Sequence, residues 1–341
     1  MPKVLLTGGS GFIATHVLEL LLKRGHEVVT TVRSEDKAKA IRDGHPGAKL
    51  TVVLVPDIAQ PNAFDEVMQT PGLDYVQHTA SPFHFRFTDA KTEMLDPAIL
   101  GTTSLLEAVK KYAPTVKRVI ITSSFAAILS EKLLTDPSKT WSEADWNPDP
   151  YERGLTGPPG TTYRVSKTLA EKTAWEFKEK ENPNFDIATI NPPMVFGPVL
   201  HHLSSLASIN TSNGNMAALT VGKWKDELPP TGVYLWVDVR DVAKGHVEAM
   251  ERPEAGGNRF FMTAGHYANK DIPPIVRKHF PQLADKLPVD GAPGGDYPGG
   301  SVANTYGYDN SKATKMLDID WIPLEQSVTD TIQSLLEVGA K

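Results

Sequence analysis

Short runs of aliphatic and β-branched residues alternate with longer amphipathic stretches along the first half of the chain. The apolar runs occupy residues 4–6, 28–32, 50–55, 75–78, 119–122 and 186–190. Apolar positions with helical spacing lie between several of them, at residues 11–23, 102–112 and 163–180. Strands that alternate with helices form βαβ units and a parallel sheet that is buried on both faces. The pattern therefore predicts the α/β class, with a doubly wound parallel sheet.

The pattern changes after residue 192, and residues 199–235 are rich in small polar residues. Further predicted elements are a strand at 234–237, a helix at 241–250, a strand at 259–262, a Gly/Pro-rich loop at 291–300 and a closing helix at 327–338. We expect a first domain over residues 1–192, to which 226–258 returns, and a smaller substrate-binding region over 193–341. That region is expected to cover the carboxyl edge of the sheet, where doubly wound sheets bind ligands.

The composition is that of an ordinary globular protein, with 40% hydrophobic and 22% charged residues. The net charge of −6 argues against nucleic acid or an anionic membrane as the main partner. The absence of cysteine excludes disulfides, thiolate metal sites and cysteine nucleophiles. The sequence shows neither a targeting segment nor an apolar run of membrane-spanning length. We therefore expect a cytoplasmic monomer or homodimer that acts on a small molecule.

Small residues follow the first predicted strand and open the first predicted helix, with the spacing Gly8-x-x-Gly11-x-x-Ala14. Small residues let the backbone turn tightly and approach a pyrophosphate, which then lies at the helix N-terminus. A purely structural glycine turn is the alternative, but the position between a strand and a helix favours a dinucleotide site. The contacts predicted here are Gly8, Gly11, Phe12 and Ile13.

The end of the second predicted strand carries residues that select between dinucleotides. An acidic residue there binds the ribose 2′-hydroxyl of NAD, whereas arginine accommodates the 2′-phosphate of NADP. This chain has Arg33, with Lys37 one helical turn later, and we therefore expect NADP(H) as the cofactor. The alternative is that both are ordinary solvated charges. Further cofactor contacts are predicted after the third and fourth strands, at Asp57, Ile58, Thr79, Ala80 and Ser81.

A tyrosine and a lysine four positions apart, Tyr163 and Lys167, share one face of a predicted helix. A free tyrosine has a pKa of about 10, and a neighbouring cation lowers this pKa, which suits the phenol for acid–base catalysis near neutrality. An ordinary amphipathic helix with a surface lysine is the alternative. The serine pair Ser123-Ser124 lies upstream, directly after the fifth predicted strand.

These features together resemble those of the extended short-chain dehydrogenase/reductases. The segments that carry the resemblance are Thr7–Ala14, Thr122-Ser123-Ser124, Tyr163-x-x-x-Lys167 and Val237–Ala243. Other segments resemble the dihydroflavonol-reductase-like branch, and in particular the fungal methylglyoxal/isovaleraldehyde (ketone) reductases. These segments are Thr30–Ser34, Val55–Ile58, His78–Phe83, Glu171–Phe177 and Asn191–Pro198.

The resemblance implies a Rossmann domain and an NADPH-dependent carbonyl reductase. It implies that Tyr163 is the proton donor, that Lys167 lowers its pKa and holds the nicotinamide ribose, and that Ser124 hydrogen-bonds the substrate oxygen. Such donors stabilise the charge that develops on oxygen when hydride reaches a carbonyl carbon. A rigid loop beside the nicotinamide is implied at Pro192 and Val195.

Two departures from the family are visible. Many relatives carry an asparagine in the central helix that supports a proton-relay water, whereas Leu100 stands near that place. The tyrosine motif typical of cinnamoyl-CoA reductases is absent, which argues against a CoA thioester substrate.

The substrate pocket is expected to be mostly apolar. The candidates are Phe83, Phe85, Phe125, Met194 and Trp224, each of which is alternatively a core residue. Residues 201–225 are expected to form a mobile lid. His201 and His202 lack a ligand cluster with metal spacing, and no metal is expected.

The sequence thus predicts an NADPH-dependent reductase of aldehydes and ketones that also runs in reverse as an alcohol dehydrogenase. One alternative is a nucleotide-sugar epimerase or dehydratase, against which Arg33 argues, because that class usually has an acid there. The other is a non-catalytic NADP(H)-sensing protein, against which the intact Tyr163/Lys167 pair argues.

Overall fold

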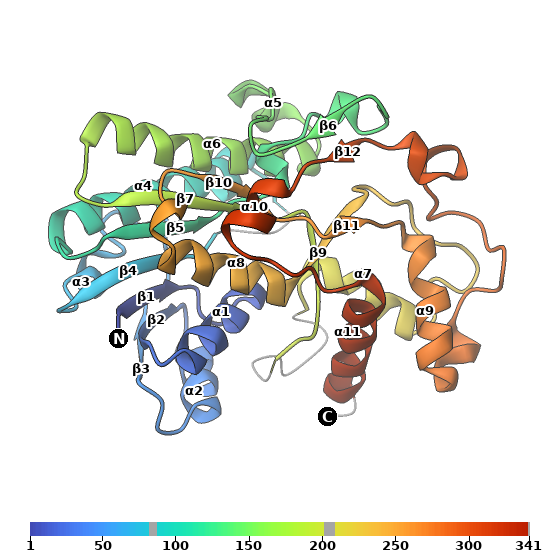
Figure 1. Cartoon of the computed structure of the whole chain (residues 1–341), viewed down its shortest axis with the longest axis horizontal. Coiled ribbons are helices and arrows are strands. Elements are labelled where there is room, and N and C mark those ends of the chain that lie inside the picture. Colours follow the sequence, from blue (N-terminus) through green and yellow to red (C-terminus); the bar gives the residue numbers. More distant parts are fainter. Residues whose placement is uncertain (82–86, 201–208, 340–341) are drawn as a thin grey trace.

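A parallel sheet of seven strands organises the fold in the computed structural model, which describes residues 1–81, 87–200 and 209–339. The spatial order of its strands is β10-β7-β5-β4-β1-β2-β3. The strands are β1 (Lys3–Thr7), β2 (Glu27–Val32), β3 (Leu50–Leu54), β4 (Leu73–His78), β5 (Arg118–Thr122), β7 (Asp186–Asn191) and β10 (Arg259–Phe261). The order runs outward from β1 in one direction and from β4 in the other, which places the topological switch point between these two strands (Figure 1).

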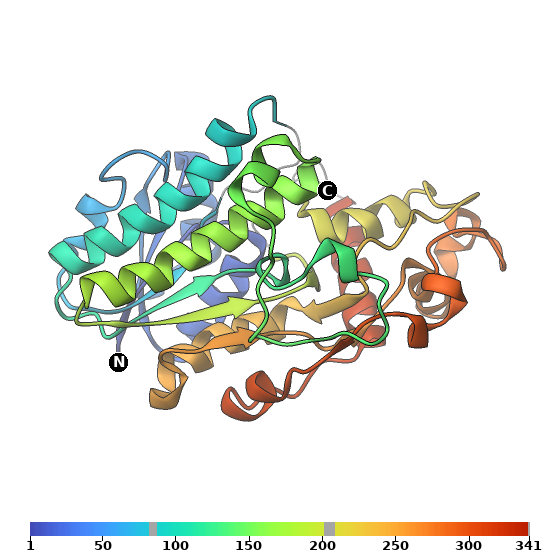
Figure 2. The ribbon, with the colours of Figure 1, turned by 90° about the horizontal axis from the view of Figure 1, so that it is seen from above.

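Helices cover both faces of this sheet. The helices on one face are α1 (Phe12–Lys23), α2 (Glu35–Gly44) and α8 (Val239–Glu251), and those on the other are α3 (Asp65–Met68), α4 (Asp96–Tyr112) and α6 (Pro159–Glu181). Seen from above, α4 and α6 lie side by side across the sheet (Figure 2). Consecutive residues of β1 serve opposite faces: Val4 and Leu6 pack with α1, whereas Leu5 packs with α4. Near-continuous apolar strands follow from this two-sided burial.

A second, smaller region lies beyond the carboxyl ends of the strands (Figure 1). Its sheet contains β8 (Met194–Phe196), β9 (Leu235–Asp238) and β11 (Gly265–His266), and its helices are α7 (Thr211–Thr220), α9 (Ile272–His279) and α11 (Leu324–Gly339). Smaller elements are α5 (Tyr151–Thr156), α10 (Ser311–Met316) and the strand pair β6 (Thr140–Trp141) and β12 (Gly307–Tyr308). The helices of this region enclose a core of their own, built around Phe196, Trp236 and Tyr267.

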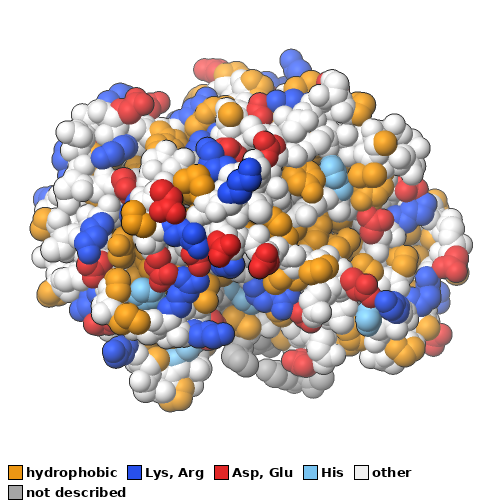
Figure 3. Space-filling model, in the orientation of Figure 1, with side chains coloured by type: hydrophobic (Ala, Val, Ile, Leu, Met, Phe, Trp, Pro, Cys, Tyr) orange, Lys and Arg blue, Asp and Glu red, His pale blue; other side chains and the backbone are white. Residues whose placement is uncertain are grey.

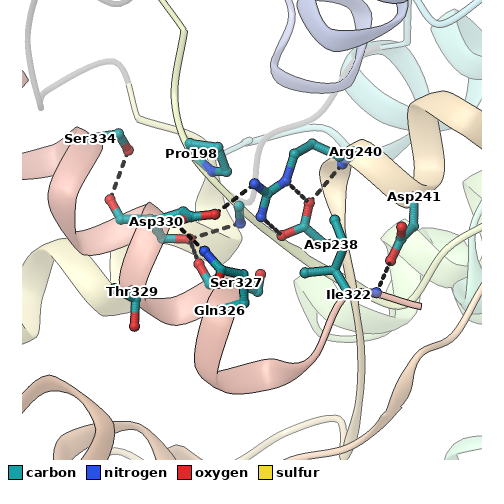
Figure 4. Close-up of polar contacts among 12 residues, drawn as sticks. Pro198, Asp238, Arg240, Asp241, Ile322, Gln326, Ser327, Thr329, Asp330 and Ser334 are labelled. Carbon is teal, nitrogen blue, oxygen red and sulfur yellow. Dashed lines mark hydrogen bonds and ion pairs between the residues drawn. The ribbon is translucent and has the colours of Figure 1, made fainter. Parts of the chain in front are cut away.

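The Val237–Ala243 segment joins the two regions (Figure 4). Asp238 is fully buried, caps α8 by accepting a hydrogen bond from the Arg240 N–H at 2.8 Å, and forms an ion pair with the Arg240 guanidinium. Arg240 also contacts Asp330 of α11 at 2.6 Å. Asp241 accepts a hydrogen bond from the Ile322 N–H at 2.9 Å, just before that helix. The signature segment therefore anchors α11 to the large sheet.

The fold predicted from the sequence is confirmed. All six predicted strands of the first half form the parallel sheet, and β10 adds the seventh. The strand predicted at 234–237 exists, but it belongs to the small sheet. The predicted helix at 163–180 begins earlier, at Pro159, because proline is well suited to the first turn of a helix.

The surface carries both signs of charge, interspersed over the face shown in Figure 3. A mixed surface of this kind agrees with the modest net charge of −6. Nowhere in the described part of the chain does a helix combine the length and the apolar character that a bilayer crossing requires.

Candidate active site

The glycine turn after β1 forms the floor of a cavity of about 300 Å³ at the carboxyl edge of the sheet. Gly8 has a φ of +72°, and a Cβ at this position would lie 3.1 Å from the Ala80 Cα, so the turn requires glycine on both counts. The Gly11 N–H donates to the Gly8 carbonyl at 2.8 Å. Gly11 is also the N-cap of α1 and provides no side chain to its first turn. The N–H groups of that turn suit an anionic ligand.

Most of the predicted cofactor residues gather around this cavity. Its lining includes Gly8, Gly11, Arg33, Lys37, Asp57, Ile58, Thr79, Ala80 and Ser81. Arg33 is exposed, and Lys37 is half-buried one turn into α2. Burial lowers the pKa of Lys37, and the neighbouring Arg33 adds to this effect. Two cations thus stand at the carboxyl end of β2, where a 2′-phosphate would lie.

The loop after β4 is fixed to β1 by the Thr7 side chain. The Thr7 Oγ1 accepts hydrogen bonds from the N–H groups of Thr79 and Ala80 at 3.2 and 3.1 Å. It therefore donates its own proton to the His78 Nδ1 at 2.9 Å. Burial lowers the pKa of His78 to about 3, so that this imidazole is neutral. The wall of the cavity is thereby held in place by uncharged groups.

Ser124 and Tyr163 face each other across the end of β5. Ser124 is buried and its Oγ accepts a hydrogen bond from the Ala126 N–H at 3.0 Å, which orients the hydroxyl. Its side chain also forms a hydrogen bond with the half-buried Tyr163. Burial raises the pKa of Tyr163, and the hydrogen bond with Ser124 acts in the opposite direction. This is the reverse of the lowered pKa expected from the sequence, because burial of the phenol has the larger effect on this pKa.

Lys167 lies one turn after Tyr163 on α6 and is buried. Its Nζ donates to the Ser81 Oγ at 3.1 Å, on the loop that lines the cofactor cavity. Burial lowers the pKa of Lys167 to about 8, and the negative charge of Glu171 partly counteracts this. The ammonium therefore links the tyrosine helix to the cofactor cavity.

The remaining predicted cofactor residues contribute main chain or packing. Phe12 and Ile13 open α1 and pack their side chains against the core. The Pro192 carbonyl accepts a hydrogen bond from the Phe125 N–H at 2.9 Å, which holds the loop after β7 against the serine segment. Val195 is buried in β8.

The predicted substrate contacts fall into three groups. Phe125 and Trp224 are buried, with Phe125 stacked on Phe261 at a centroid distance of 5.0 Å, and their role as substrate contacts stays a prediction. Met194 is half-buried at the start of β8. Phe83, Phe85 and the first part of the predicted lid, including His201 and His202, lie outside the described residues.

The position of Leu100 differs from the sequence-based expectation. Its side chain is 50% exposed on α4 and does not line the small cavity beside Lys167. Thr102, two residues later, is the α4 residue that lines a small cavity beside Lys167. A shift of two residues turns a helix by about 200°, which explains the difference. Leu100 therefore does not occupy the position of a relay residue.

Glu171 is a site residue to which the sequence analysis assigned no role. Its carboxylate is buried one turn after Lys167 and accepts hydrogen bonds from the Ser123 hydroxyl and from the Asn191 side chain. The spacing from Lys167 was the available signal, but the partners come from other strands. Within the described residues, no group of three or more His, Asp or Glu side chains is arranged to hold a metal ion.

Three comparisons relate the chain to known proteins. A model of the NAD dependent epimerase/dehydratase family matches residues 4–264. Ketoreductase azaE of Aspergillus niger is 46% identical over 98% of both chains, and the NADPH-dependent methylglyoxal reductase GRE2 of Saccharomyces cerevisiae is 36% identical over 98% of both. Cinnamoyl-CoA reductase CAD2 of Medicago truncatula is also 36% identical, over 98% of this chain and 95% of its own.

The same kinship appears in three dimensions. The crystal structure of yeast methylglyoxal/isovaleraldehyde reductase Gre2 complexed with NADPH has a TM-score of 0.90 to this chain, at 34% identity and 99% coverage of both chains. Vestitone reductase from alfalfa has a TM-score of 0.74 at 25% identity and full coverage of both chains. The match extends through the small region, so the resemblance is not confined to the nucleotide-binding half.

Proposed function

The chain belongs to the NAD dependent epimerase/dehydratase family, and within it we propose a carbonyl reductase in which Tyr163 donates the proton to the substrate oxygen. The chain is an NADPH-dependent oxidoreductase, as are relatives that match it over nearly its whole length. The observation that supports Tyr163 as the proton donor is its contact with Ser124, one helical turn from Lys167.

The described residues fit NADPH. The cavity of about 300 Å³ runs from the glycine turn to the two cations of Arg33 and Lys37. Gly8 and the first turn of α1 would hold the pyrophosphate, and the two cations would hold the 2′-phosphate. Lys167, which reaches the same cavity through Ser81, would hold the nicotinamide ribose. When bound, NADPH supplies the hydride that reduces the carbonyl carbon.

The chain's own groups act on the substrate oxygen. The Ser124 Oγ accepts from the Ala126 N–H and its side chain forms a hydrogen bond with Tyr163, so its hydroxyl proton can be donated to a substrate oxygen beside the phenol. Tyr163 supplies a second donor and transfers its proton to the oxygen as negative charge develops there. The raised pKa of Tyr163 keeps the phenol protonated at neutral pH, which suits a proton donor. The Lys167 ammonium then stabilises the phenolate that remains.

Replacement of Tyr163 by phenylalanine tests the proposal. We expect Tyr163→Phe to lower kcat by about 10²–10⁴-fold with aldehydes, diketones and aryl ketones, because general acid catalysis contributes on that scale. NADPH binding, followed by fluorescence, should persist because the ring remains. Turnover at the wild-type rate would remove Tyr163 from the mechanism. Binding of NADPH without turnover of any carbonyl by the wild type would favour a non-catalytic sensor instead.

Cofactor selection is tested at Arg33. Arg33→Asp is expected to shift the preference from NADPH toward NADH, measured as the ratio of the two kcat/KM values. An unchanged ratio would remove Arg33 from the selection. The epimerase or dehydratase alternative predicts a cofactor that stays bound through purification and no net consumption of NADPH.

The substrate class is proposed to be small and medium aldehydes and ketones. The absence of the cinnamoyl-CoA-reductase tyrosine motif argues against CoA thioesters, although one relative of that name is 36% identical. We propose that the enzyme is cytoplasmic and a monomer or homodimer. We also propose that residues 1–192 with 226–258 form the cofactor domain, together with β10, the seventh strand of its sheet.

A further inference from the structure

A buried ion pair lies directly behind the proposed catalytic residues. Glu171 on α6 and Arg259 at the start of β10 are 1% and 10% exposed, and their closest N–O distance is 2.6 Å. Burial of two charges is costly unless they are paired and hydrogen-bonded. The Glu171 carboxylate has such hydrogen bonds, because it also accepts from the side chains of Thr189 and Trp175. A pair of this cost, placed one turn from Lys167, invites a functional explanation.

Arg259 is equally well satisfied. Its guanidinium donates to the carbonyl of Asp145 at 2.7 Å and to that of Glu143. It also stacks on the Trp146 ring, with 3.6 Å between the Cζ and the ring centroid. The guanidinium thus fixes the edge strand β10 to the segment before α5, and it is held in one place relative to Glu171.

The carboxylate reaches the catalytic serine through two neighbours. The Ser123 hydroxyl donates to the Glu171 Oε2. The Asn191 Nδ2 donates to the same oxygen at 2.8 Å and to the Ser124 carbonyl at 3.3 Å. The backbone on both sides of the Ser124 side chain is therefore tied to Glu171.

The carboxylate also acts on Lys167. Both side chains line a cavity of about 20 Å³, together with His78, Thr102 and Ser123. The polar groups that surround Lys167 come from four elements: neutral His78 at the end of β4 with Ser81 after it, Thr102 from α4, Ser123 after β5 and Glu171 from α6. Tyr163 precedes Lys167 by one turn on α6. Among these, Glu171 bears the negative charge, and it favours the ammonium against the desolvation that burial imposes.

We propose that the Glu171–Arg259 pair is a positioning element of the reductase, which fixes the Ser123-Ser124 segment and keeps Lys167 in its ammonium form. Neither residue need touch substrate or cofactor for this role. The inference rests on the proposed function of Ser124 and Lys167. Its test is a direct titration of Lys167, which is independent of turnover.

The experiment is NMR titration of the protein labelled with ¹³Cε-lysine, in which Lys167→Arg identifies the Lys167 signal by removing it. In Glu171→Gln the midpoint of Lys167 should fall by about one pH unit or more, because an opposite charge four residues away on a helix is lost. The double variant Glu171→Gln/Arg259→Met removes both charges of the pair. In this double variant the Lys167 midpoint should fall less, because no unpaired Arg259 charge remains nearby. The double variant replaces the single one if Glu171→Gln does not fold.

Asp186→Asn is the matched control. Asp186 pairs with the buried Arg118, and these are the first residues of β7 and β5. This ion pair therefore lies at the amino ends of the strands, whereas the proposed site lies at their carboxyl ends. Loss of this carboxylate should leave the Lys167 midpoint at the wild-type value. A wild-type midpoint in Glu171→Gln, or an equal fall in Asp186→Asn, would overturn the charge role. A kcat in the Glu171 variants equal to that of the wild type would overturn the positioning role.

The two proposals fail separately. If Tyr163→Phe keeps full activity while Glu171→Gln moves the Lys167 midpoint, the proposed mechanism is wrong and the charge role of the pair stands. If Tyr163→Phe is inactive and the midpoint does not move, the reductase mechanism stands and the charge role is lost.

Discussion

Two buried ionisable groups, one at the catalytic site and one in the segment that anchors α11, are held where their charged forms are costly. Burial lowers the pKa of Lys167 in the catalytic region to about 8. Burial raises the pKa of Asp241, in the segment that anchors α11, to about 7. The physical cause is the same, and the sign follows from the charge that each group carries.

The surroundings of the two groups differ. Lys167 lies between the cofactor cavity and Glu171 and donates to Ser81. Asp241 accepts a hydrogen bond from the Ile322 N–H and lies beside the Asp238–Arg240 pair (Figure 4). The unfavourable burial of charge therefore accompanies a catalytic role at Lys167. At Asp241 it accompanies a structural role only. Substitutions that remove the charge of Lys167 or of Asp241 should therefore differ in their effect on activity.

Lys167→Met is expected to have the largest effect. Reductase activity should fall by at least about 10²-fold, because the phenolate of Tyr163 loses its stabilising cation. The free energy of unfolding at pH 7 should nevertheless rise by about 2 kcal/mol. The buried ammonium costs about 3 kcal/mol, from the difference between about 8 and the ordinary 10.5, and the lost bond to Ser81 offsets about 1.

The pH dependence of this gain follows from the sign of the shift. The folded chain releases the Lys167 proton at about 8, whereas the unfolded chain keeps it to 10.5, so the stability of the wild type rises with pH between these values. The advantage of Lys167→Met should narrow over that window in denaturant titrations. An inactive variant that is also less stable at every pH would contradict the account.

Asp241→Asn should stabilise the protein without loss of activity. The folded chain binds a proton on Asp241 between the ordinary 3.8 and about 7, so the stability of the wild type falls as the pH rises through this window. The asparagine keeps an acceptor for the Ile322 N–H and carries no charge. We expect a gain of up to about 4 kcal/mol at pH 8, from the difference between 3.8 and about 7, that shrinks toward pH 5, with kcat within about twofold of the wild type. A stability difference that does not depend on pH would exclude Asp241 as its source.

The sheet and the residues of the cofactor cavity were predictable from local sequence. Strand–helix alternation predicts the sheet, and the residues after its strands, such as Gly8, Arg33 and Ser81, meet in one cavity because parallel strands end at a common edge. The pair of Tyr163 and Lys167 follows from helical spacing alone.

What the sequence did not predict depends on tertiary contacts. The partner of Glu171 is Arg259, 88 residues away in the chain, and the ion pair exists only once β10 joins the sheet. The environment of Asp241 likewise requires residue 322 to return from the far end of the chain. The raised pKa of Tyr163 arises from burial, which residue spacing does not report. Charge–burial conflicts of this kind emerge from packing and carry no short motif.

Asp330→Asn, which weakens the contact between α11 and Arg240, should have a smaller effect on stability. Asp330 accepts from the Arg240 guanidinium at 2.6 Å and from the Gln326 side chain at 2.7 Å, and its side chain is 26% exposed. Arg240 keeps its second partner, Asp238, so the free energy of unfolding should fall by only about 1 kcal/mol. Thermal unfolding measures this loss, and kcat should not change. A loss of catalysis equal to that of Lys167→Met would mean that the two regions are coupled.

Leu100→Asn should have the smallest effect and sharpens the boundary of the catalytic region. Leu100 is 50% exposed, whereas Thr102 lines the cavity beside Lys167 and donates to the Ala98 carbonyl at 3.0 Å. An asparagine at position 100 therefore reaches solvent and cannot support a relay water beside Lys167. We expect stability within about 0.5 kcal/mol of the wild type and an unchanged pH profile of kcat. Thr102→Val is the paired variant, because it removes a hydroxyl from the cavity at nearly constant volume. A changed pH profile in Leu100→Asn but not in Thr102→Val would reverse the assignment and return the relay position to residue 100.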